Sequence, residues 1–232
     1  MRTSELFEKE LKLIKNEHMR SIVAATLDAS PECIQTIPAS SSGRYHPTYS
    51  LGEGGLSRHV KATVGIAWSM IESDVLKGLM NDDKNKELYE DVVYASLILH
   101  DCCKPDDTEK HSTRFDHPLV GAKLFKETMT EYIKNAPSHT WSEYDKEYLR
   151  IAISLTFKCI QCHMGKYTTA PYARGVVLPK PENNLEWFVH LCDLLSSRKY
   201  LEFDFEKYYK TLKVWVKTKW LSLVQIVKIA NT

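Results

Sequence analysis

A histidine followed by an aspartate, His100-Asp101, stands at the end of a long apolar stretch, and it constrains the fold more than any other feature. The stretch from Leu88 to Leu99 has the length and composition of a buried helix, and Pro105 ends it soon afterwards. Burying an imidazole and a carboxylate at a helix end is costly unless another group compensates for the lost hydration. A metal ion does so, because it binds a neutral histidine nitrogen and an ionised aspartate oxygen together.

The composition is that of an ordinary globular chain. Of the 232 residues, 43% are hydrophobic and 26% are charged, and this length suits one domain. The net charge of +1 argues against long nucleic acid as a partner. A polar N-terminal segment and the lack of an apolar run of roughly 18 residues predict neither a signal peptide nor a membrane span. We therefore expect a cytoplasmic protein whose six cysteines are reduced.

Apolar residues recur at helical spacing through most of the chain. Besides the helix that ends at His100, the pattern predicts helices over 4–28 (one or two, capped by Ser4), over 59–80 with His59 in the first turn, from 117, over 142–163 and from 184. Residues 205–230 mix alternating and continuous apolar positions, which does not decide between helix and strand. We expect N-terminal helices over 1–35 that pack on a core domain of residues 36–204, and a C-terminal appendage over 205–232.

Two irregular segments flank the candidate ligands. Residues 36–56 are rich in Ser, Gly, Pro and Tyr, and this composition fits a linker as well as a functional loop. Residues 167–181 are also irregular. Both segments could form walls of a pocket, with Tyr45 and Tyr172 as candidates for substrate contact.

Six residues of the types that bind metal ions in proteins lie at the ends or on the inner faces of different predicted helices. Each has an ordinary explanation when taken singly, such as a structural histidine or a buried salt bridge. The six are His59, His100, Asp101, His117, His163 and Asp193. Several nitrogen and carboxylate ligands in one helical core are typical of a two-metal site bridged by a carboxylate.

At these positions the chain resembles the HD-domain superfamily of metal-dependent phosphohydrolases, over about residues 56–200. A Gly-rich lead-in, Gly52-Glu53-Gly54-Gly55, is similar to one in bacterial and phage HD proteins. The other matching segments are His100-Asp101-Cys102-Cys103-Lys104 (H-D-x-x-K), His117-Pro118-Leu119-Val120-Gly121-Ala122 (H-P-x-x-G-A), Ile160-Gln161-Cys162-His163-Met164-Gly165 (I-x-x-H-x-G) and Cys192-Asp193-Leu194-Leu195-Ser196. The resemblance implies an all-α HD-domain helical bundle with a metal site in its core.

The resemblance also implies two divalent metal ions (Mn, Co, Mg, Fe or Zn) with one shared carboxylate. The implied ligands are His59, His100, Asp101 and Asp193 for the first ion, and His117, His163 and the bridging Asp101 for the second. Many binuclear members have two adjacent histidines where this chain has Cys162-His163. That departure puts the strength and metal preference of the second site in question.

The activity that the resemblance implies is hydrolysis of a nucleotide or another small phosphate ester by a metal-bridged hydroxide. Asp101 would be catalytic through the metals, and Lys104 would stabilise the charge that develops on the phosphate. Arg58 and Arg114 are weaker candidates for phosphate contact, alongside Tyr172. The resemblance identifies neither the bond that is cleaved nor the oligomeric state.

Three other functions share part of this residue pattern. An HD-fold di-iron oxygenase acting on a polyol or an organophosphonate shares the ligand order and the lysine, so it stays the main alternative. A non-catalytic binding module would be expected to have lost ligands. The run Cys159-Ile160-Gln161-Cys162-His163 matches the C-x-x-C-H motif of haem attachment. Haem attachment requires export, for which no signal peptide is evident, and Cys159 lies on the apolar face of its helix.

Overall fold

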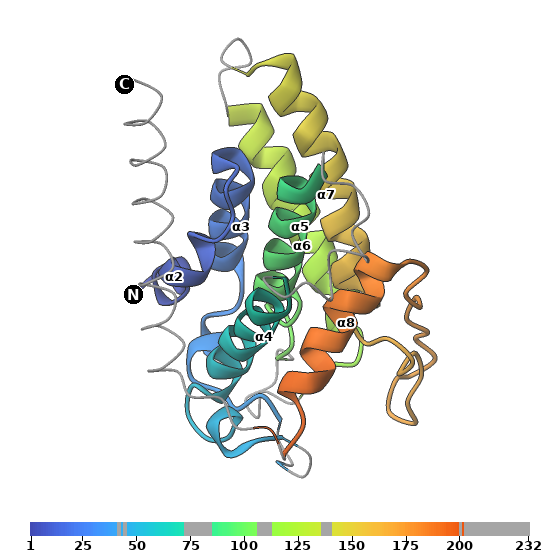
Figure 1. The fold of residues 1–232 in the computed structure, drawn as a ribbon. Helices are drawn as coiled ribbons and strands as arrows, with labels where there is room; N and C mark the ends of the chain where they lie inside the picture. Colours follow the sequence, from blue (N-terminus) through green and yellow to red (C-terminus); the bar gives the residue numbers. More distant parts are fainter. Residues whose placement is uncertain are drawn as a thin grey trace, which may run out of the picture. The chain divides into compact units, whose positions relative to one another are not determined.

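Helices make up the regular structure of the described chain. The computed structural model describes residues 1–40, 43, 46–71, 85–105, 113–135, 141–199 and 201. Within these ranges no strand forms, and an isolated antiparallel bridge joins Pro105 to Thr113. The predicted all-α fold class is therefore confirmed (Figure 1).

The elements follow one another along the chain, with two short 3₁₀ turns among them. They are α1 (Thr3–Leu6), α2 (Glu8–Leu11), α3 (Glu17–Ala29), η1 (Glu32–Gln35), η2 (Thr48–Ser50), α4 (Gly55–Ile71), α5 (Lys86–Leu99), α6 (His117–Asn135), α7 (Glu143–Cys162) and α8 (Asn184–Ser196). The chain divides into two compact units, Met1–Leu201 and Glu202–Thr232, and the second lies outside the described residues. None of the described helices combines the length and the apolar composition needed to cross a membrane.

Helix α5 is the central element. From Leu88 to Leu99 every residue except Tyr89 is buried, which is expected of a helix that is apolar on all sides. It packs against α3, α4, α7 and α8, and Figure 1 shows it in the middle of the unit. The end of α5, where His100 and Asp101 follow, is therefore surrounded by other helices.

The N-terminal segment is broken more often than the sequence predicts. Three helices replace the one or two expected over 4–28, and Ser4 lies inside α1 instead of capping it. The break between α2 and α3 has a tertiary cause: the backbone N–H groups of Lys15 and Asn16 both donate to the carboxylate of Asp91 on α5, at 2.8 Å each. Backbone groups held in this way cannot continue a helix, and Asn16 instead caps α3 through Met19.

Asp91 is predicted to be a main determinant of stability. Its buried carboxylate accepts from Lys15, Asn16 and, at 2.6 Å, the hydroxyl of Tyr148 on α7. Asp91→Ala removes the acceptor of all three donors, of which the Tyr148 hydroxyl is buried, so we expect it to lower the free energy of unfolding in urea by about 3 kcal/mol. Tyr148→Phe removes a single bond and should cost about 1 kcal/mol. Equal stability of the two variants would contradict this role for Asp91.

The described part of segment 36–56 is fastened to the helices around it. The guanidinium of Arg58 donates to the carbonyls of Tyr49 and Leu51, and the hydroxyl of Tyr49 donates to the carbonyl of Ser196 on α8 at 2.9 Å. Of the two interpretations of residues 36–56, these contacts favour a functional loop over a flexible linker.

Helix α4 begins at Gly55, four residues earlier than predicted, so His59 lies in its second turn. Leu56 N–H bonds to the carbonyl of Ile37, and Gly55 packs so tightly on the Ser50 carbonyl that a Cβ would not fit. The remainder of the helix predicted over 59–80, beyond Ile71, lies outside the described residues.

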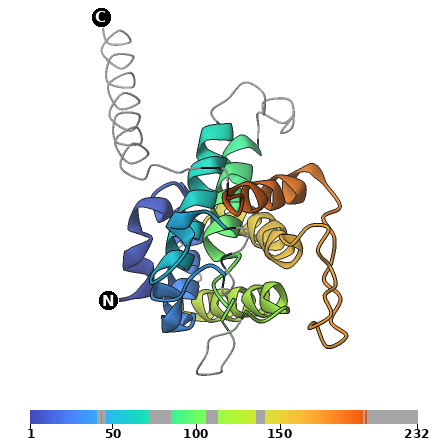
Figure 2. The same cartoon turned by 90° about the horizontal axis from the view of Figure 1, so that it is seen from below.

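The remaining helices begin and end close to where the sequence predicts. Helix α6 begins at His117, α7 is capped by Ser142 and ends before His163, and α8 begins at Asn184. Between α7 and α8 the chain makes a long irregular excursion, which extends away from the helices in Figure 2. Ala173 and Leu178 from this segment form a small apolar cluster with Phe115, which precedes α6.

Candidate metal centre

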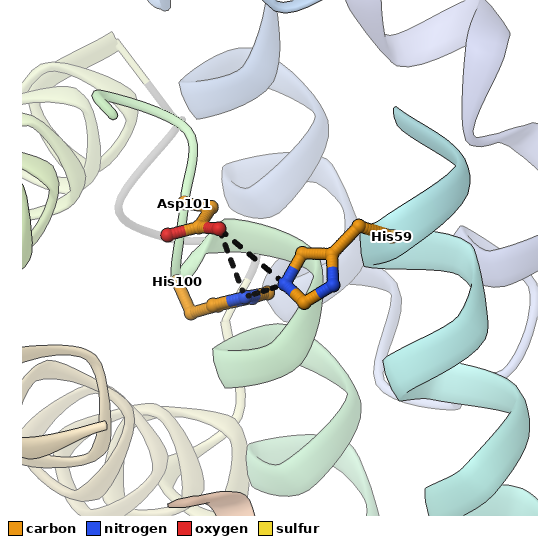
Figure 3. Close-up of side chains that lie close together, drawn as sticks. All are labelled: His59, His100 and Asp101. Atoms are coloured by element: carbon orange, nitrogen blue, oxygen red, sulfur yellow. Dashed lines mark hydrogen bonds and ion pairs between the residues drawn. The ribbon is translucent and has the colours of Figure 1, made fainter. Parts of the chain in front are cut away.

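Five helices bring the predicted metal ligands to one place in the core. His100 is the C-terminal cap of α5 and Asp101 follows it, His163 caps α7, and His117 opens α6, while His59 and Asp193 come from within α4 and α8. The four imidazoles and Asp101 are almost completely buried. Figure 3 shows the ring of His59 directed at His100 and Asp101.

The imidazole rings are oriented by hydrogen bonds at Nδ1. Three of them contact the backbone carbonyl three residues earlier: His100 to Leu97 at 2.7 Å, His117 to Arg114 at 2.8 Å and His163 to Ile160 at 2.8 Å. A carbonyl only accepts, so each Nδ1 carries the hydrogen and each Nε2 presents a lone pair. Metal-binding histidines are commonly oriented in this manner.

His59 is oriented by a side chain instead of a carbonyl. Its Nδ1 lies 3.0 Å from the hydroxyl oxygen of Ser196, and that hydroxyl donates to the carbonyl of Asp193 at 2.8 Å. Ser196 therefore accepts from Nδ1–H, which leaves the Nε2 lone pair of His59 free to face the centre. All four imidazoles present Nε2 to the same small volume.

Asp101 lies between two pairs of imidazoles and directs one oxygen at each. Its Oδ2 is 3.5 Å from Nε2 of His59 and 3.4 Å from Nε2 of His100, while Oδ1 is 3.0 Å from Nε2 of His117 and 3.7 Å from Nε2 of His163. The carboxylate therefore belongs to both groups, as a bridging ligand would.

Asp193 completes the first group. Its Oδ1 is 3.1 Å from Nε2 of His59 and 3.7 Å from Nε2 of His100. The first group then offers four potential ligands and the second offers three. The two groups that could each hold a metal ion share Asp101.

The donor atoms fit metal ions better than they fit each other. The two Nε2 atoms of His59 and His100 are 3.3 Å apart, and those of His117 and His163 are 3.2 Å apart. Lone pairs at such separations repel, whereas an ion about 2.1 Å from each nitrogen accounts for the spacing. Oδ1 of Asp101 is buried and has no hydrogen-bond partner among the described residues. A metal ion would satisfy it.

Electrostatics favour the metal-binding forms of Asp101, Asp193 and His163. At His100, in contrast, Asp101 and Asp193 outweigh burial and raise the pKa. Burial alone would raise the pKa of Asp101, but Lys104 and His100 hold that pKa well below its usual range. The neighbouring His59 and His100 likewise outweigh burial and keep the pKa of Asp193 low. Burial, together with His100 and His117, lowers the pKa of His163 to about 3, so this ring is neutral.

Lys104 is the predicted substrate-binding residue that contacts the ligands. Its Nζ lies 2.6 Å from Oδ2 of Asp101, and its side chain is 15% exposed. Asp193 is 18% exposed, so this side of the centre is the one that reaches solvent.

The other predicted substrate contacts have partners elsewhere. Arg58 fastens the loop described above, and Arg114 forms a two-pronged ion pair with Asp116 at 2.8 and 3.0 Å. Tyr172 is 65% exposed and packs edge-on against Phe115. Substrate binding by Arg58, Arg114 and Tyr172 stays a prediction, and Tyr45 lies outside the described residues.

Three residues around the centre were not singled out from the sequence. Besides Ser196, they are His46, whose ring lies against His59, and His190, whose Nδ1 is 2.7 Å from the carbonyl of His163. The ring of His190 fills the space where a Cβ on Gly165 would lie, and Gly165 has φ +61°. Ser196 and His190 stand three residues on either side of Asp193, a helical spacing that could have revealed them.

Ser196→Ala is predicted to weaken the first metal site. Without the hydroxyl, Nδ1 of His59 loses its acceptor and the ring loses its fixed orientation. We expect the affinity for Mn²⁺ at the first site to fall about 10- to 100-fold, as measured by metal titration. Ser197→Ala is the matched control, because the hydroxyl of Ser197 donates to the carbonyl of Leu194 and not to a candidate ligand. Equal metal affinity of the two variants would contradict the prediction.

The two cysteines of the C-x-x-C-H run pack in the core. None of the six cysteines forms a disulfide, and Cys159 and Cys162 are both buried. Burial raises the pKa of the Cys162 thiol to about 12, so it is protonated. In Cys162-His163, the cysteine is a packed thiol and the histidine is the potential ligand.

Comparisons of the chain with models of known families, with curated proteins and with solved structures find no match. The structure thus supports a helical protein whose buried histidines and aspartates could bind metal ions, an arrangement compatible with an HD-type site.

Proposed function

We propose that the protein is an HD-type, metal-dependent phosphohydrolase that acts on a nucleotide or another small phosphate ester. The observation that carries the proposal is the position of Asp101 between two pairs of Nε2 atoms. A carboxylate shared between two histidine pairs is the ligand arrangement of a two-metal hydrolase. The order of the ligands in the sequence, His, His-Asp, His, His, Asp, supports the same class.

The chemistry would divide between the metals and the chain. When bound, two divalent cations supply Lewis acidity, because they acidify water and neutralise charge on a phosphoryl group. His59, His100 and Asp193 would hold the first cation, His117 and His163 the second, and Asp101 both. Lys104 would place its ammonium beside the phosphoryl oxygens and stabilise their negative charge.

The exposure of the centre favours a small substrate that approaches at the first group. Lys104 and Asp193 reach solvent, while all four imidazoles are buried. A phosphate group entering beside Lys104 would meet a cation before it meets the second pair of histidines. The net charge of +1 gives no broad attraction for a polyanion, which agrees with a nucleotide-sized ligand.

The first test is elemental analysis of the purified protein, combined with phosphate release from a panel of nucleotides under Mn²⁺, Co²⁺ and Mg²⁺. Occupancy approaching one ion at each of the two ligand groups, with metal-stimulated release, would support the proposal. Two irons, no phosphate release and oxygen uptake with a polyol or a phosphonate would instead establish the oxygenase. If no metal binds under any loading condition, both functions are excluded.

A further inference from the structure

His46 lies beside the first ligand group, in the segment that leads into α4. Its ring meets the ring of His59 edge-on, with 5.9 Å between the centroids and an angle of 64°. Burial, together with the neighbouring His59, lowers the pKa of His46 to about 4. Because it lies beside the first ligand group, His46 stands where a substrate would approach.

The backbone that follows His46 is anchored to neighbouring elements. The hydroxyl and the backbone N–H of Ser50 both donate to the carbonyl of Pro47, which closes the chain into a tight turn. The bonds from Arg58 to Tyr49 and from Tyr49 to Ser196 then tie this turn to α4 and α8. The backbone that presents His46 is thus anchored on the two helices that carry His59 and Asp193.

His46 differs from the other imidazoles of the centre in the state of its Nδ1. The Nδ1 atoms of His59, His100, His117, His163 and His190 each have a hydrogen-bond partner in the protein. Nδ1 of His46 is buried and has no partner among the described residues. Such unpaired buried atoms are rare in folded proteins and call for a ligand, water or ion to satisfy them.

We propose that His46 is a substrate contact, and that its Nδ1–H donates a hydrogen bond to a phosphoryl oxygen held at the first ligand group. This inference rests on the proposed phosphohydrolase function and adds a residue to its substrate site. Lys104 supplies a mobile cation on one side of the phosphate, and His46 supplies a directional donor on an anchored loop. A fixed donor orients the phosphate in a way that a flexible ammonium cannot.

Two amide substitutions distinguish the ring nitrogens. The amide nitrogen of asparagine lies where Nδ1 of histidine lies, and that of glutamine lies where Nε2 lies. The probe is inorganic phosphate, titrated by calorimetry into the Mn²⁺-loaded full-length protein. We expect His46→Gln and His46→Ala to weaken phosphate binding about tenfold. His46→Asn should stay within about threefold of the parent protein, and all three variants should keep their Mn²⁺ affinity within the same limit.

Each other outcome overturns the inference in a recognisable way. If His46→Ala binds phosphate as tightly as the parent, His46 is no contact, and the phosphohydrolase proposal stands unaffected. If the variants lose Mn²⁺ together with phosphate, His46 merely supports His59. If the Mn²⁺-loaded parent neither binds phosphate nor releases it from esters, the proposed function fails and the inference fails with it.

Discussion

Asp101→Asn should empty the second metal site, weaken the first and lower phosphate release by at least about a thousandfold. The amide keeps the size of the side chain but offers a single oxygen and no charge, so it cannot bridge. The second group would retain only the rings of His117 and His163. Without the second metal ion, the transition state loses several kcal/mol of electrostatic stabilisation. A loss of about 4 kcal/mol corresponds to a thousandfold decrease in rate. Metal content and kcat with the best substrate measure the two effects.

Two further variants separate a bridging role from a general effect of lost charge. Asp193→Asn removes a ligand that contacts the first pair of histidines, so the second site should stay loaded. Asp116→Asn removes a carboxylate that lies next to His117 in the sequence but pairs with Arg114, so metal content should be unchanged. An Asp101→Asn protein that keeps two metals and its activity would refute the bridging role.

The clustering of the candidate ligands could be anticipated from the sequence because three of the four histidines occupy marked positions on their helices. His100 and His163 fall at the ends of apolar stretches, and His117 precedes a proline at a helix start. Once such a histidine is placed, the carbonyl three residues earlier is within reach of Nδ1, so the orientation of the ring follows from local geometry. Local patterns therefore specify most of the centre.

The features that sequence reasoning missed depend on contacts between distant segments. Ser196 orients His59 from 137 residues away. Its spacing from Asp193 places Ser196 on the same face of the helix, but it does not indicate that the hydroxyl contacts His59. The break before α3 arises because Asp91 captures two backbone N–H groups, and the early start of α4 arises because Gly55 packs on Ser50. Periodicity reports which face of a helix is apolar, but it cannot report which partner interrupts the helix. The undecided segment 205–230 lies outside the described residues.

Lys104→Met should lower kcat about 100- to 1000-fold and leave both metal sites loaded. Methionine keeps much of the apolar stem, so the change isolates the ammonium. The position of that group is set locally, since the carbonyl of Lys104 accepts from the N–H of Arg114 and Nζ reaches Oδ2 of Asp101 at 2.6 Å. Because the side chain is partly exposed, it can turn from Asp101 to an arriving phosphate. Steady-state kinetics and metal analysis of the same preparation check the prediction.

The outcome for metal content decides between two roles for this lysine. If Lys104 acts on the phosphate, Lys104→Arg should recover part of the lost rate, because it restores a cation, and metal affinity should not follow the rate. If Lys104 instead serves to position Asp101, metal affinity and rate will fall together in Lys104→Met. An unchanged rate in Lys104→Met would leave the ion pair with Asp101 as its only role. The ion pair at 2.6 Å is compatible with both roles, so the separation of rate from metal binding is the result that assigns Lys104 to catalysis.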